Sequence, residues 1–175
     1  MKNKKKRNPY DVHKTDPVLY WLAVHVIKLW FRLFFGLKIN NEGVKGIKTP
    51  FLLLANHESN YDFLMDAVAL YPNKLHIMVT SYFFHHSLLG WLLRHMGCIP
   101  KKQFVPDTGA IKSVLRLIER GENVCIFPEG QTCYTGETSD FDESTAKLVK
   151  KLGVTVAAST VRGNHLAFPK WAPHK

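Results

Sequence analysis

Four short apolar runs alternate with helix-like stretches, and this alternation constrains the fold of the chain more than any other feature. The runs are FLLLA (51–55), LHIMVT (75–80), NVCIF (123–127) and VTVAAS (154–159). Each is mostly apolar on both faces, as is typical of strands buried in a parallel sheet. Helical patterns cover residues 61–71, 87–97, 107–121 and 142–153. The sequence therefore predicts an α/β domain with a mixed, largely parallel sheet flanked by helices.

An apolar helix is predicted before this pattern, over residues 17–35. Asp16 suits its N-cap, Pro17 its first position and Gly36 its end. Basic residues at spacings of three and four form one stripe: His25, Lys28 and Arg32. Because a charge at the bilayer centre costs a few kcal/mol, the pattern favours an amphipathic helix in the membrane interface over a spanning helix. A helix packed on the domain's own core is the alternative.

Charge and cysteine content narrow the class of protein. The chain has 175 residues, which suits one domain, and a net charge of +10. Five of the positive charges lie at the start: Lys2, Lys4, Lys5, Lys6 and Arg7. This basic tail is either simply disordered or attracted to an anionic surface. No nucleic-acid partner is expected, because the chain lacks a helix-turn-helix pattern and interleaved aromatics. Three cysteines without C-x-x-C indicate a reducing environment with no structural disulfide or zinc.

Polar residues follow the first strand in NHESNYD (56–62), where α/β proteins usually place their sites. Ser59 and Asp62 also fit a capping box that begins the next helix. His57 and Asp62 would lie about 140° apart on a continuous helix, so they meet only if the chain turns between them. Ser59 as the helix cap would supply that turn, which makes the capping and catalytic interpretations compatible.

Two further stretches carry candidate chemistry. FPEG follows the third apolar run and places Glu129 and Gly130 at its end. A carboxylate there is costly to bury without partners, and glycine lets a ligand approach the backbone. GCIPKK (97–102) delivers Lys101 and Lys102, which suit phosphate binding. An ordinary turn and a solvated loop are the structural alternatives for these two stretches.

Together these stretches resemble the lysophospholipid and glycerolipid acyltransferases, whose best-known members act on 1-acylglycerol-3-phosphate. The family's N-H-x4-D motif is matched by Asn56, His57 and Asp62, and its F-P-E-G motif by residues 127–130. Its Gly-led basic loop is approximated by residues 97–102, and the later STAKLVKKLGV and RGNHLAFPKWA are similar to the bacterial branch. Many members carry an arginine directly after F-P-E-G or at the neighbouring position. This chain has Gln131, Thr132 and Cys133 there.

The resemblance implies an enzyme that moves a fatty acyl group from a thioester to the free hydroxyl of a lysophospholipid, in phospholipid biosynthesis. His57 would be the general base and Asp62 its orienting carboxylate. The acceptor would be held by a second set of residues: Asn56, Lys101, Lys102, Glu129, Gly130 and Arg162. Acyl-CoA or acyl carrier protein would be the donor, with no metal or bound cofactor. A non-enzymatic membrane-binding domain of the same fold is the alternative.

The charge pattern, the apolar helix and the resemblance together divide the chain into three segments. We expect a basic disordered tail over 1–16, an amphipathic interfacial helix over 17–36 and the acyltransferase domain over 37–175. The chain ends ten residues after His165 without a clear closing element, so a C-terminal truncation stays open. The expected location is the cytoplasmic face of the cell membrane, as a peripheral or monotopic protein on an anionic surface.

Overall fold

Helices and strands alternate through most of the computed structural model, which describes residues 8, 10–133 and 137–167. The strands are β1 (Phe51–Ala55), β2 (Leu75–Thr80), β3 (Ile99–Lys101), β4 (Asn123–Ile126) and β5 (Thr155–Ser159). The α-helices are α1 (Pro17–Phe35), α2 (Asp62–Leu70), α3 (Ser87–His95), α4 (Thr108–Glu119), α5 (Glu143–Leu152) and α6 (Asn164–Ala167). Two 3-10 helices, η1 (Glu42–Val44) and η2 (Ser81–His85), complete the described elements.

The five described strands form one sheet in the order β3-β2-β4-β1-β5, and every pairing between them is parallel. This confirms the predicted α/β class and the four predicted strands. β3 was not predicted, because three residues that include Pro100 give too short a pattern. Nor was α6, which is a single turn, predicted. The carboxyl ends of all five parallel strands lie on one side of the sheet, where NHESNYD and FPEG begin.

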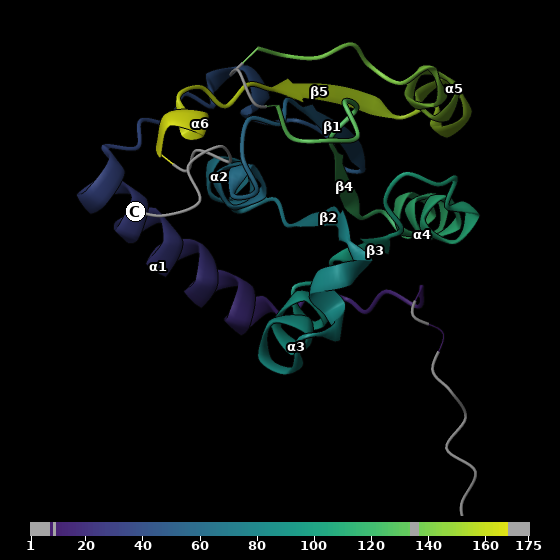
Figure 1. Ribbon diagram of the computed structural model, residues 1–175, viewed down its shortest axis with the longest axis horizontal. Coiled ribbons are helices and arrows are strands. Elements are labelled where there is room, and N and C mark those ends of the chain that lie inside the picture. The colour runs from purple at the N-terminus through teal and green to yellow at the C-terminus, as the bar shows by residue number, and fades with distance from the viewer. Residues whose placement is uncertain (1–7, 9, 134–136, 168–175) are drawn as a thin grey trace, which may run out of the picture.

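Helices cover both faces of the sheet, as Figure 1 shows. The alternation of side chains along β1 produces two cores. Phe51, Leu53 and Ala55 pack in the core beneath α1 and α2, while Leu52 packs in the core beneath α4 and α5. A strand that buries both faces has to be apolar throughout, and this explains the continuous run FLLLA.

The predicted N-terminal helix is present with its predicted caps. Asp16 accepts hydrogen bonds of 3.0 Å from the backbone N–H of Val18 and Leu19. Gly36 ends the helix with a φ of 62°, a conformation that glycine adopts without strain. The helix is long and apolar enough to cross a membrane. However, Tyr20 is buried and its hydroxyl accepts a hydrogen bond of 3.1 Å from the N–H of Leu75, so one side of α1 belongs to the domain core.

The segment before α1 falls partly outside the described residues, which begin at position 8 and omit position 9. Residues 1–7, with the basic cluster, are therefore not described, and their disorder stays a prediction. The described part of the expected tail contacts the domain. Tyr10 donates a hydrogen bond of 3.0 Å from its hydroxyl to Asp107 Oδ2. Its ring also lies where a Cβ on Gly109 would be, at 2.6 Å.

Candidate active site

His57 and Asp62 meet at the carboxyl end of β1. His57 Nδ1 lies 3.0 Å from Asp62 Oδ2, and Asp62 is fully buried at the start of α2. A carboxylate only accepts hydrogen bonds, so Nδ1 carries the proton and Nε2 presents its lone pair. Among the described residues, Nε2 has no hydrogen-bond partner. The pair therefore has the geometry of a base with an orienting carboxylate.

The turn between the two residues differs in detail from the prediction. Tyr61, not Ser59, occupies the N-cap position of α2, and its side chain makes no capping hydrogen bond. Ser59 Oγ accepts from the N–H of Tyr61 at 3.3 Å, while Asp62 Oδ2 accepts from the N–H of Ser59 at 2.7 Å. Only the carboxylate half of the capping box is formed, because α2 begins at Asp62 and Ser59 lies two residues before its N-cap.

The loop after β4, which begins with FPEG, contacts His57 at its backbone N–H, its carbonyl and its ring. Glu129 Oε1 accepts a hydrogen bond of 2.8 Å from the N–H of His57. The N–H of Cys133 donates to the carbonyl of His57 at 2.7 Å. The ring of Phe127 stacks on the imidazole with centroids 4.2 Å apart and planes 22° apart. Both backbone groups and one ring face of His57 are thus held by the loop after the neighbouring strand, β4.

Asn56 and Glu129 make their described contacts with the chain's own backbone. Asn56 donates to the carbonyl of Val161 at 2.9 Å and accepts from the N–H of Val161 at 2.7 Å. Glu129 Oε2 accepts from the N–H of Ser139 at 2.9 Å. Both side chains therefore join loops at the carboxyl end of the sheet. Their predicted contact with the acceptor stays a prediction.

The predicted cationic residues lie on opposite sides of the site. Lys101 ends β3 at one edge of the sheet, and Arg162 follows β5 at the other edge. These strands are four positions apart, or about 19 Å at the usual strand spacing. One phosphate group could therefore contact the predicted cations of only one edge. Lys102 is exposed, and its N–H donates to Asp107 Oδ2 at 2.8 Å. Arg162 lines a cavity of about 590 Å³. Gly130 adopts a φ of 70° in the tight turn after β4.

A second buried carboxylate lies one turn beyond Asp62 on α2. Asp66 is almost fully buried, and its Oδ1 accepts a hydrogen bond of 2.6 Å from the hydroxyl of Ser159. Burial raises the pKa of Asp66 to about 7; the bond from Ser159 lowers this pKa and the charge of Asp62 raises it. Asp66 was not predicted, although its spacing of four from Asp62 places both on one helix face.

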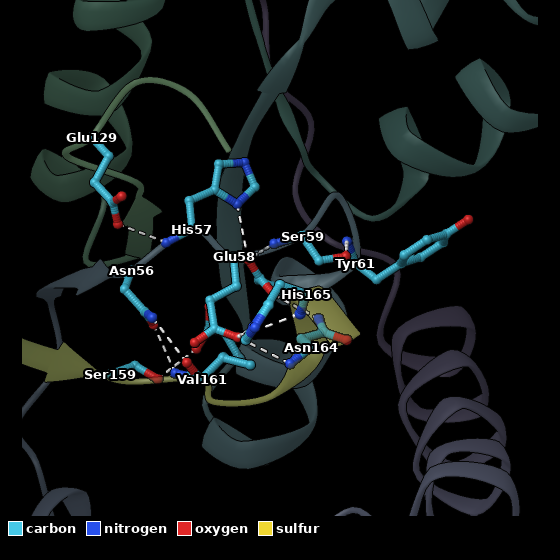
Figure 2. Close-up of polar contacts among 12 residues, drawn as sticks. Asn56, His57, Glu58, Ser59, Tyr61, Glu129, Ser159, Val161, Asn164 and His165 are labelled. Carbon is cyan, nitrogen blue, oxygen red and sulfur yellow. Dashed lines mark hydrogen bonds and ion pairs between the residues drawn. The ribbon is translucent and has the colours of Figure 1, made fainter. Parts of the chain in front are cut away.

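Sequence reasoning also missed the contacts of Glu58 and Asn164. Glu58 Oε2 accepts from the N–H of Asn164 at 3.0 Å, and Figure 2 shows these two residues beside His57. Asn164 Nδ2 donates to Asp62 Oδ1 at 2.6 Å. The stretch RGNH (162–165) lies in a part of the sequence similar to the bacterial branch, but its residues alone indicate no role. Only its position beside NHESNYD in the folded chain gives it a part in the site.

Comparison with known proteins identifies the family of this fold and site. A profile of the Acyltransferase family matches residues 36–162. The chain therefore belongs to the Acyltransferase family, which confirms the resemblance seen in its motifs.

Several known members are similar to this chain. The chloroplastic 1-acyl-sn-glycerol-3-phosphate acyltransferase LPAT1 of Arabidopsis thaliana is 28% identical over 161 residues, which cover 88% of this chain and 45% of that protein. The 1-acyl-sn-glycerol-3-phosphate acyltransferase of Bacillus subtilis is 25% identical over 112 residues, covering 64% of this chain and 56% of that protein. The chain spans about half the length of the curated relatives it matches.

A solved structure supports the fold. The crystal structure of the 1-acyl-sn-glycerophosphate acyltransferase PlsC from Thermotoga maritima is similar with a TM-score of 0.70 and 18% sequence identity. The match covers 86% of this chain and 60% of that one. At this identity the likeness confirms the architecture alone, with its parallel sheet and flanking helices.

Proposed function

We propose that the protein transfers a fatty acyl group from a thioester donor to the free hydroxyl of a lysophospholipid, 1-acylglycerol-3-phosphate, in phospholipid biosynthesis. The observation that carries this proposal is the contact of 3.0 Å between His57 Nδ1 and Asp62 Oδ2, which leaves Nε2 as a proton acceptor. A thioester is already activated, so the catalyst has mainly to make the hydroxyl nucleophilic. The relatives from Arabidopsis thaliana and Bacillus subtilis are 1-acyl-sn-glycerol-3-phosphate acyltransferases, and that activity agrees with this chemistry.

In the proposed reaction His57 Nε2 takes the proton of the acceptor hydroxyl as its oxygen attacks the thioester carbonyl. The imidazolium that forms is stabilised by Asp62. When the tetrahedral intermediate collapses, the carbon–sulfur bond breaks and the thiolate leaves with the proton from His57. The products are an acylated lipid and a free thiol, and His57 returns to its starting state. No group of the protein is acylated in this sequence.

The acceptor is proposed to bind along the carboxyl ends of the strands. Lys101 and Lys102 would contact its phosphate from the β3 side, with Arg162 as the candidate on the β5 side. Glu129, Gly130 and Asn56 would line the glycerol-binding part beside His57. Acyl-CoA or acyl carrier protein is proposed as the donor, without a metal or bound cofactor, because base catalysis on a thioester needs neither.

A membrane surface is proposed to bind the outward side of α1. At 100° per residue, the core-facing residues of α1 lie within an arc of about 60°: Tyr20, Val24, Ile27 and Phe31. Exposed aliphatic residues occupy a similar arc about 180° away: Val18, Leu22, Leu29 and Leu33. The basic stripe of His25, Lys28 and Arg32 lies beside this exposed arc. Such an arrangement suits a helix lying flat on an anionic bilayer, here proposed to be the cytoplasmic face of the cell membrane.

A thiol-release assay tests the proposed function. The full chain is supplied with lysophosphatidate and either acyl-CoA or acyl carrier protein carrying a fatty acyl group, and the diacyl product is identified by mass spectrometry. We expect thiol release that depends on the acceptor and is lost in His57→Ala. Vesicle binding without acceptor-dependent thiol release would favour the alternative, a non-enzymatic membrane-binding domain.

A further inference from the structure

Asn164 and Asp62 share a hydrogen bond of 2.6 Å although they are 102 residues apart in the sequence. The bond runs from Asn164 Nδ2 to Asp62 Oδ1. The amide nitrogen has to face Asp62, because a carboxylate cannot donate. Both side chains are buried. Since buried polar groups cost free energy when they lose a partner, this contact is part of how the site is held.

The two oxygens of Asp62 have different partners. Oδ2 accepts from His57 Nδ1 at 3.0 Å and from the N–H of Ser59 at 2.7 Å. Oδ1 accepts from Asn164. Rotation of a carboxylate about its last side-chain bond is broad and roughly two-fold. A donor on Oδ1 therefore restricts the plane of the carboxylate and keeps Oδ2 directed at the imidazole.

Asn164 is itself held by Glu58. Glu58 Oε2 accepts from the N–H of Asn164 at 3.0 Å and lies 3.0 Å from Nδ1 of His165. Glu58 is buried and belongs to the same NHESNYD segment as His57 and Asp62. Asn56 adds two hydrogen bonds to Val161, three residues before Asn164. The segment after β5 is thus attached to the catalytic segment at three positions, and Asn164 is the one that reaches the catalytic pair.

We propose that Asn164 is a positioning residue, which acts on catalysis through Asp62 by fixing the carboxylate that orients His57. Glu58 holds Asn164 in place by accepting a hydrogen bond from its backbone N–H. This inference rests on the proposed function, because Asn164 is proposed to act, through Asp62, on the general base of that reaction. Asn164 is buried and its side chain contacts Asp62, so it is expected to affect the chemical step and not the affinity for acceptor or donor.

Kinetics of Asn164→Ala test the proposal. We expect kcat to fall by about ten- to hundred-fold, the range for losing a hydrogen bond to a charged group. KM for acceptor and donor should stay the same. Asn164→Ser, which leaves a smaller void but cannot reach Asp62, should behave alike. Leu166→Ala, an exposed change on the same helix, is the control and should retain wild-type kcat. Wild-type kcat in Asn164→Ala would overturn the proposal.

A double-mutant cycle separates positioning from general support of the fold. In an Asp62→Asn background, Asn164→Ala should change kcat by less than about twofold, because its effect passes through the missing carboxylate. If Asn164→Ala lowers kcat by the same factor in both backgrounds, Asn164 only supports the fold and the proposal is wrong. Melting temperatures of all variants show which of them remain folded.

Nuclear magnetic resonance gives a readout that does not need activity. In the full chain labelled with ¹⁵N-histidine, the imidazole signals of His57 are assigned by their absence from His57→Ala. The wild type should show a downfield proton on Nδ1, hydrogen-bonded to Asp62. That signal should broaden or disappear in Asn164→Ser and persist in Leu166→Ala. Its persistence in folded Asn164→Ser would overturn the inference. Failure of the proposed function would instead appear as a wild type that releases no thiol.

Discussion

Glu129 Oε1 accepts a hydrogen bond of 2.8 Å from the backbone N–H of His57, and thereby joins the loops that follow β4 and β1. The second oxygen of the same carboxylate binds the N–H of Ser139 at 2.9 Å. The backbone position of the proposed base therefore depends on a side chain 72 residues further along. Because β1 and β4 are neighbours in the sheet, two motifs distant in the sequence form one site.

Removal of the catalytic pair should abolish most activity. His57→Ala should lower kcat by about 10²–10⁴-fold, the usual contribution of general acid–base catalysis. Asp62→Asn should also be severe while the protein stays folded, because an amide cannot stabilise an imidazolium. Thiol release and melting temperature are measured together. An Asp62→Asn variant with nearly full activity would reduce Asp62 to a purely structural role.

Substitution of Glu129 distinguishes backbone positioning from acceptor binding. Glu129→Gln keeps one acceptor oxygen but cannot bind the N–H groups of both His57 and Ser139. We expect kcat to fall by about tenfold, since a displaced base reacts poorly. A rise in KM for lysophosphatidate would support the predicted contact with the acceptor. Wild-type values of both constants would contradict both roles for Glu129.

The buried carboxylate of Asp66 should make stability depend on pH. Its pKa of about 7 exceeds the ordinary value of 3.8, so between these values the folded protein holds a proton that the unfolded chain has lost. The free energy of unfolding should therefore fall as pH rises through this range, by at most about 1.4 kcal/mol per pH unit. Urea unfolding at pH 5, 6 and 7 measures this slope. Asp66→Asn should have a flatter dependence, and identical slopes would refute the assignment.

The two sides of α1 should respond differently to polar substitution. Serine at three exposed positions, Leu22, Leu29 and Leu33, should weaken sedimentation with anionic vesicles and leave the melting temperature unchanged. Val24→Ser, on the core side, should lower the melting temperature. High salt should weaken vesicle binding without abolishing it. A depth-sensitive label at Lys28 located at the bilayer centre would indicate a spanning helix instead.

Loss of the lysines after β3 should affect acceptor binding. Lys101→Ala and Lys102→Ala should raise KM for lysophosphatidate by about tenfold, because a charge-assisted contact is lost equally from ground and transition states. KM for the donor should not change. Lys112→Ala is the control, because it removes one positive charge from an exposed position on α4, away from the strand ends. It should leave this KM unchanged. If Arg162→Ala alone raises this KM, the phosphate binds on the β5 side.

Features that depend on residues close together in the sequence could be predicted from the sequence. The apolar runs predicted four strands, because a strand covered on both faces needs apolar residues throughout. The caps of α1 at Asp16 and Gly36 were predicted because helix ends are satisfied locally. The N-H-x4-D and F-P-E-G motifs located His57, Asp62 and Glu129 at strand ends. Their spacing alone did not fix the turn, in which Tyr61 and not Ser59 precedes the helix.

Features that depend on contacts between distant segments were decided by the tertiary structure. The strand order places β4 beside β1, and this brings Glu129 and Phe127 to His57. The packing of α6 against NHESNYD brings Asn164 to Asp62. Both sides of α1 are apolar, so only packing against β1 and α2 determined which side joins the core. The strand order and the position of α1 follow from the burial of apolar surface between elements. The position of α6 follows from buried hydrogen bonds to NHESNYD. Neither kind of contact between distant segments is encoded in a local pattern.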